Sequence, residues 1–154
     1  MTARGWFEYI RAEVLALEDR KRDLETMRLQ AEGGGGGYEA MGKGGTPSDA
    51  GPGVIRLVQA SEDIDRDQAG INAEIEQALA VLYGNDGDGG LAKLKTSADA
   101  DILCAYYLQG MEWEQVANDL SAEGSASPKH WCVMRARRAL DFIERYGVRN
   151  LQRF

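Results

Sequence analysis

Residues 99–143 read DADILCAYYLQGMEWEQVANDLSAEGSASPKHWCVMRARRALDFI, and they carry the clearest structural pattern in the chain. An apolar helix is predicted to end at Gly110, and a second short helix is predicted to follow from Trp113. A polar turn then leads to a long helix rich in arginine. A short helix, a turn and a basic helix in this order are typical of domains that lay one helix in the DNA major groove. We therefore predict an all-α protein with a C-terminal helix-turn-helix domain at residues 97–147.

Local signals set the ends of these helices. Ser97 is predicted to cap the helix at 98–109, because a serine oxygen can accept from a free N–H of the first turn. Ser127 is predicted to cap the last helix, and Pro128 suits its first turn, where no N–H donor is needed. That helix is predicted to stop at Gly147, since glycine commonly ends helices.

The last helix has one apolar and one polar face. Steps of 100° per residue from Ala136 place a set of apolar side chains within about 60° of it. These are Cys132, Val133, Ala139, Leu140 and Ile143. The far side holds His130, Met134, Arg137 and Arg138, and the flanks hold Trp131 and Arg135. The helix is therefore predicted to bury small residues and to present basic side chains outward.

The outward face supplies the candidate DNA-binding residues. The side chains predicted to reach base edges lie near the N-terminal end of the helix, where recognition helices read DNA: Lys129, His130, Trp131 and Met134. The predicted phosphate contacts, which fix the register, are Arg135, Arg137 and Arg138. Ser127, at the cap, completes the set. For Trp131, a half-buried place in the core is an equally good interpretation.

Two long helices are predicted ahead of this domain. Residues 1–32 form the first, with apolar side chains on one face and charges on the other. Residues 33–53 are rich in glycine and contain two prolines, so they are predicted to be a flexible connector. Residues 54–83 form the second helix, which carries a heptad seam. Its members are Leu57, Ser61, Ile64, Gln68, Ile71, Ile75, Ala78 and Leu82.

The seam needs a partner, because a lone acidic helix of about 45 Å would be poorly stable. Two arrangements satisfy it. One is an antiparallel hairpin with residues 1–32, and the other is a coiled coil between chains. We predict a homodimer through the long helices.

Charge is distributed unevenly along the chain. The net charge is −7, which by itself argues against nucleic acid. Residues 54–124 carry four basic and fourteen acidic side chains, whereas residues 125–154 carry seven and two. A basic end on an acidic body can hold phosphates with one face. The acidic body should weaken non-specific binding.

No catalytic or cofactor-binding pattern stands out. Residues 37–44 lack the hydroxyl and the preceding strand of a phosphate loop, and residues 86–97 lack the closing Glu of a calcium loop. His130 and Cys132 cannot supply the four ligands of a structural zinc site. One histidine also leaves most base chemistry unsupported. We predict no enzyme activity, no cofactor and no metal.

The composition also predicts the compartment. No apolar run is long enough to span a membrane, and the N-terminus lacks a continuous apolar signal region. Cys104 and Cys132 have no paired spacing, so they are interpreted as buried thiols in a reducing compartment. We therefore predict a cytoplasmic protein with no membrane partner.

The segment 106–140 resembles region 4 of bacterial sigma factors and, more closely, the sigma-like phage regulators of the ArpU, RinA and related uncharacterised phage families. The shared pattern is W-E-[EQ]-[IV]-A-x-x-L, here Trp113–Leu120, then apolar-x-x-R-apolar-x-R-A-L, here Cys132–Leu140. The turn Ser121–Ala126 is longer than the family's. The resemblance implies a sequence-specific regulator of phage or prophage genes in a bacterial host. Its implied partners are double-stranded DNA and RNA polymerase.

Two other classes of protein fit the same organisation. Small terminase subunits, which package DNA, also join a helix-turn-helix to an oligomerising coiled coil, although their DNA-binding part usually comes first in the chain. A coiled-coil adaptor whose basic end binds an acidic partner would need no DNA at all. Binding to RNA polymerase, and a dimer rather than a ring in solution, would favour the regulator.

Overall fold

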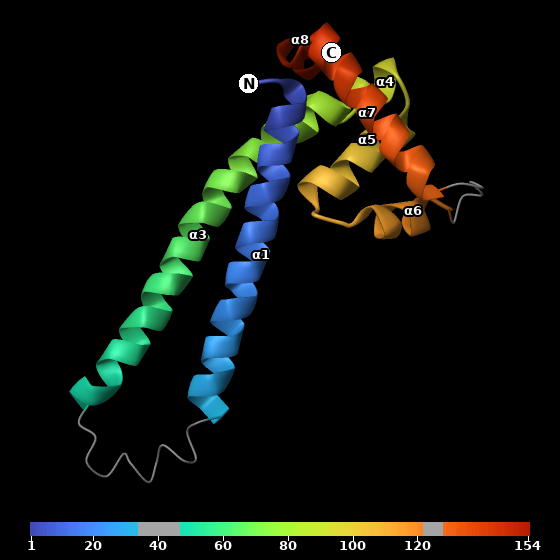
Figure 1. Ribbon diagram of the computed structural model, residues 1–154. Helices are drawn as coiled ribbons and strands as arrows, with labels where there is room; N and C mark the ends of the chain where they lie inside the picture. Colours follow the sequence, from blue (N-terminus) through green and yellow to red (C-terminus); the bar gives the residue numbers. More distant parts are fainter. Residues whose placement is uncertain (34–46, 122–127) are drawn as a thin grey trace. The chain divides into compact units, whose positions relative to one another are not determined.

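The computed structural model describes residues 1–33, 47–121 and 128–154, and every element in those ranges is a helix (Figure 1). This confirms the predicted all-α fold. The chain divides into two compact units. The hairpin unit is Ala16–Gly70, and the head unit joins Met1–Leu15 to Ile71–Phe154. None of the described helices is long and apolar enough to cross a membrane.

Two long helices, α1 (Ala3–Gly33) and α3 (Pro47–Tyr83), supply the hairpin unit. They run side by side in opposite directions there (Figure 1). Leu17 and Leu24 of α1 and Ile64 of α3 are buried. Lys21 Nζ donates to Gln68 Oε1 at 2.5 Å. The predicted seam therefore packs against α1 of the same chain, which is the hairpin alternative.

The second long helix starts earlier than predicted. It begins at Pro47, whereas the sequence pattern placed residues 47–53 in the connector. Proline is tolerated at a first helical position because the N–H it lacks would have no partner there. The rest of the predicted connector, residues 34–46, lies outside the described residues.

The head unit contains the short helices and the basic helix. Their bounds are α4 (Gly90–Leu94), α5 (Ser97–Leu103), the π-helix η1 (Cys104–Leu108), α6 (Trp113–Ser121), α7 (Pro128–Tyr146) and α8 (Val148–Arg153). The basic helix α7 packs against α5, α6 and α8. The largest fully buried side chains of this unit include Phe7, Leu82, Ile102 and Ile143. The ends of the two long helices thus share one core with the short helices.

Three local details differ from the sequence prediction. Thr96, not Ser97, caps α5, because its extended backbone lets its hydroxyl accept from the N–H of Asp99 at 3.2 Å. The helix then widens into η1, where Gln109 N–H donates to the Cys104 carbonyl at 3.0 Å. After Gly147 the chain forms α8, which no sequence pattern indicated. The predicted stop at Gly110 is confirmed by its positive φ of 74°.

Candidate nucleic-acid interface

The inner face of α7 is almost fully buried. Cys132, Ala139 and Ile143 are 0 % exposed, and Ala136 is 2 % exposed. Val133 is half-buried at the edge of this stripe. Close packing follows from the two alanines, since their small side chains let neighbouring helices approach. The helix is therefore docked over most of its length, as its periodicity predicted.

The outer face of α7 carries most of the predicted site residues. His130, Arg137 and Arg138 are exposed, and Trp131 and Met134 are half-buried. A cleft of about 560 Å³ lies along this face. It is lined by Lys95, Asp99, His130, Trp131, Met134, Arg135 and Arg138. The cleft thus has an aromatic ring and a thioether among basic groups.

Arg135 makes contacts within the protein that the sequence did not predict. Its Nε donates to Asp99 Oδ1 at 2.6 Å, and a terminal nitrogen donates to Thr96 Oγ1 at 2.9 Å. Its guanidinium also lies 4.6 Å from the centre of the Trp131 ring. Asp99 is only 3 % exposed, so this ion pair joins α7 to the start of α5. The prediction that Arg135 mainly contacts phosphate does not match these internal contacts.

Lys129, in the first turn of α7, makes only an exposed ion pair. Lys129 Nζ lies 3.3 Å from Glu114 Oε1 of α6, and both side chains are exposed. An exposed pair of this kind is easily exchanged for another anion, because solvent already screens it. Ser127, the predicted cap, lies outside the described residues.

Lys95 belongs to the site, although it was not predicted. It follows α4, and its Nζ lies 3.6 Å from Asp99 Oδ2 and 5.8 Å from the centre of the Phe142 ring. Lys95 and Arg138 line the same cleft. The only local signal for Lys95 was its place directly before the capping Thr96. That signal indicates a helix start and says nothing about α7.

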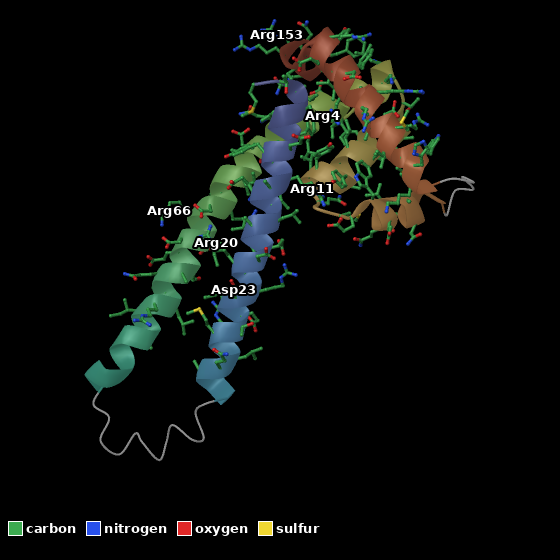
Figure 2. The ribbon with its side chains drawn as sticks, viewed as in Figure 1. Arg4, Arg11, Arg20, Asp23, Arg66 and Arg153 are labelled. Atoms are coloured by element: carbon green, nitrogen blue, oxygen red, sulfur yellow. The ribbon has the colours of Figure 1, made fainter. Side chains whose placement is uncertain are left out.

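Arg11 of α1 binds the segment that precedes α6. Arg11 lies on α1 (Figure 2). Its guanidinium lies 3.7 Å from the centre of the Tyr106 ring and donates to the carbonyls of Tyr106 and Met111. The Tyr106 ring stacks on Trp113 at 3.8 Å between centroids. The π-helix η1 and the start of α6 are therefore held in place by cation–π, stacking and hydrogen-bond contacts together.

Both cysteine thiols of the head unit have a raised pKa. Burial raises the pKa of the Cys132 thiol, which the charge of Arg135 partly offsets. Burial, followed by the charge of Asp101, raises the pKa of Cys104. In the part of the chain that the structure describes, no cluster of three or more His, Cys, Asp or Glu could hold a metal ion. The site therefore offers positive charge, hydrogen-bond donors and apolar surface for binding.

In comparisons with known proteins, no family model, no curated protein and no solved structure matches this chain.

Proposed function

We propose that this protein is a sequence-specific regulator of transcription that binds double-stranded DNA with the outer face of α7. The observation that carries the proposal is the contrast between the two faces of this helix. Cys132, Ala136 and Ile143 are buried, whereas His130 and Arg138 face solvent. A recognition helix needs one docked face and one face free to enter the major groove.

The outer face divides into two chemical tasks. Met134 and the Trp131 ring offer apolar contact of the kind that reads thymine methyl groups, and His130 offers a hydrogen-bond partner for base edges. Arg137, Arg138 and Lys129 supply the charge that meets phosphate and fixes the register. Arg135 positions α7 through its ion pair with Asp99, so it is not among the proposed phosphate contacts.

RNA polymerase is the second proposed partner. This proposal rests on the sigma-like pattern at Trp113–Leu120 and Cys132–Leu140. Retention of purified polymerase on the immobilised protein tests it. Absence of retention would leave a DNA-binding regulator that acts without contacting the enzyme.

A matched pair of variants tests DNA binding. Arg137→Ala with Arg138→Ala should reduce affinity for a duplex selected from a random pool at least tenfold at about 0.15 M salt. Arg28→Ala with Arg56→Ala removes the same charge from exposed positions of the hairpin unit and should leave affinity within about twofold. Helix content by circular dichroism should be unchanged in both. Equal affinities of the two variants would contradict the proposal.

A further inference from the structure

In the part of the chain that the structure describes, nine lysine and arginine side chains are in ion pairs. In the hairpin unit Arg20 pairs with Asp67 and Arg66 with Asp63, and in the head unit Arg4 pairs with Glu8. Among the described residues of the head unit, the basic side chains without an ion pair gather mainly on α7 and α8. They are Lys93, Arg137, Arg138, Arg145, Arg149 and Arg153.

The two arginines of α8 lie on one face. Leu151 is 0 % exposed and fixes the inner side of this helix. Arg149 and Arg153 stand two residues before and after it, so at 100° per residue both fall on the side opposite to Leu151. Both are exposed, and both line one depression of about 630 Å³ together with Gln152 and Glu76. Figure 2 shows Arg153 directed away from the helices of the head unit.

The two neighbouring arginines do not stabilise α8. Like charges four residues apart repel each other and destabilise a helix. Neither arginine has a carboxylate within ion-pair distance in the described part of the chain, and Glu76 lies in the same depression without pairing with them. A pair of cations kept apart from an available carboxylate is suited to an anion from outside the chain.

The length of α7 bears on which anion could reach these arginines. Nineteen helical residues span about 28 Å, whereas the major groove is about 12 Å wide. When the N-terminal half of α7 occupies the groove, its C-terminal end projects past the phosphate backbone. Gly147, with a φ of 99°, then turns the chain into α8. The negative end of the α7 dipole would repel phosphate there, and Arg145 with the α8 arginines offsets it.

We propose that Arg149 and Arg153 bind the phosphate backbone of duplex DNA that flanks the site contacted by α7. This second contact lengthens the footprint and adds affinity that does not depend on sequence. It rests on the proposed DNA-binding function, because the flanking duplex exists only if α7 binds a site on DNA.

The experiment uses the full chain and two duplexes that share one selected site, about 12 and about 24 base pairs long at ~3.4 Å per pair. Affinity is measured over a salt series by fluorescence anisotropy. Wild type should bind the long duplex more tightly than the short one. Arg149→Ala with Arg153→Ala should lose this gain, and its salt dependence on the long duplex should be shallower by about 1.8 in log–log slope. Its affinity for the short duplex should change less than twofold.

The charge-matched control is Arg28→Ala with Arg56→Ala, which should keep the wild-type slope and the gain with length. If wild type and the α8 variant show the same slope and the same gain, the α8 contact is wrong while the α7 interface stands. If wild type binds neither duplex, both proposals are wrong. If the α8 variant keeps the wild-type slope but sediments as a smaller species, the arginines bind a second copy of the chain, which also overturns the proposal.

Discussion

The Asp99 carboxylate, at 3 % exposure, accepts a hydrogen bond from Arg135 Nε at 2.6 Å and so ties the first turn of α5 to the middle of α7. Thr96 completes the link, since its hydroxyl accepts from both the Asp99 N–H and Arg135. The outward aim of the neighbouring His130, Met134 and Arg138 depends on how firmly this link holds α7.

We expect Arg135→Ala to lower the free energy of unfolding by about 2–4 kcal/mol, because it leaves a buried carboxylate with only Lys95 at 3.6 Å. Asp99→Ala should cost a similar amount, and the double variant less than the sum. Urea denaturation measures all three. Lys129→Ala is the control, since its pair with Glu114 is exposed and should contribute under about 1 kcal/mol. Additive costs would show that the two side chains do not stabilise each other.

The turn before α6 requires glycine. Gly110 has a φ of 74°, and a Cβ there would lie 3.2 Å from Leu15 Cδ2 and 3.3 Å from Val14 Cγ1. Gly110→Ala should therefore destabilise the protein by about 1–3 kcal/mol. Gly70→Ala, within α3 and with open space around its Cβ, should instead stabilise it by about 0.5–1 kcal/mol. Thermal unfolding compares the two, and a cost no larger at position 110 than at position 70 would contradict this account.

Arg11 should not be replaceable by lysine. Its planar group contacts the Tyr106 ring and two carbonyls at once, which an ammonium group cannot reproduce. We expect Arg11→Lys and Arg11→Ala to lose most of the same stability, about 1–3 kcal/mol. Arg4→Lys, in an exposed pair with Glu8, is the control and should be nearly neutral. If Arg11→Lys kept the full wild-type stability, the positive charge alone would explain the role of Arg11, and this prediction would be wrong.

Alkaline pH should weaken the fold through Tyr83 and Cys104. The Tyr83 hydroxyl donates to Asp101 Oδ1 at 2.5 Å, and burial followed by this bond raises the pKa of Tyr83 above its ordinary 10.0. Burial likewise raises the pKa of Cys104 above 9.0. A raised pKa in the folded state contributes stability that is complete below the unfolded pKa and is lost as pH rises through the folded pKa.

The free energy of unfolding, measured by urea titration between about pH 7 and about pH 10.5, should therefore fall at the alkaline end. The double variant Tyr83→Phe with Cys104→Ala should fall less steeply. An identical slope in wild type and the double variant would assign the alkaline loss to other groups.

Dimerisation through the long helices stays a prediction, and it now depends on different residues. The seam of α3 is used within the chain, whereas Leu29, Val54, Ile55 and Val58 are 59 %, 56 %, 56 % and 49 % exposed. Exposed apolar clusters of this kind commonly mark interfaces. Sedimentation should show a dimer for wild type and a monomer for Ile55→Ser with Val58→Ser. Tyr9→Ser, exposed on α1 of the head unit, should keep the dimer. If the wild type were a monomer, a second copy of the chain would be excluded as the partner of these apolar residues.

Most of the helices and their buried faces could be predicted from local patterns in the sequence. The heptad seam of α3 and the apolar stripe of α7 are local periodic patterns, so each helix carries the information about its own buried side. The same reasoning gave the stop at Gly110, since positive φ is cheap only for glycine. The predicted cap of α5 was one residue off, because Ser97 and Thr96 both offer a hydroxyl that can accept from a backbone N–H, and only the backbone angles distinguish them.

The tertiary structure alone decided which helix covers the seam and what each charged group touches. The partner of Arg135 lies 36 positions away, and the carbonyl that binds Arg11 lies 95 positions away. The cleft residue Lys95 and the α8 arginines likewise gain meaning only from their neighbours in space. Helix periodicity is set by neighbours within about four residues, whereas ion pairs and clefts depend on the packing of distant segments, which no local pattern encodes.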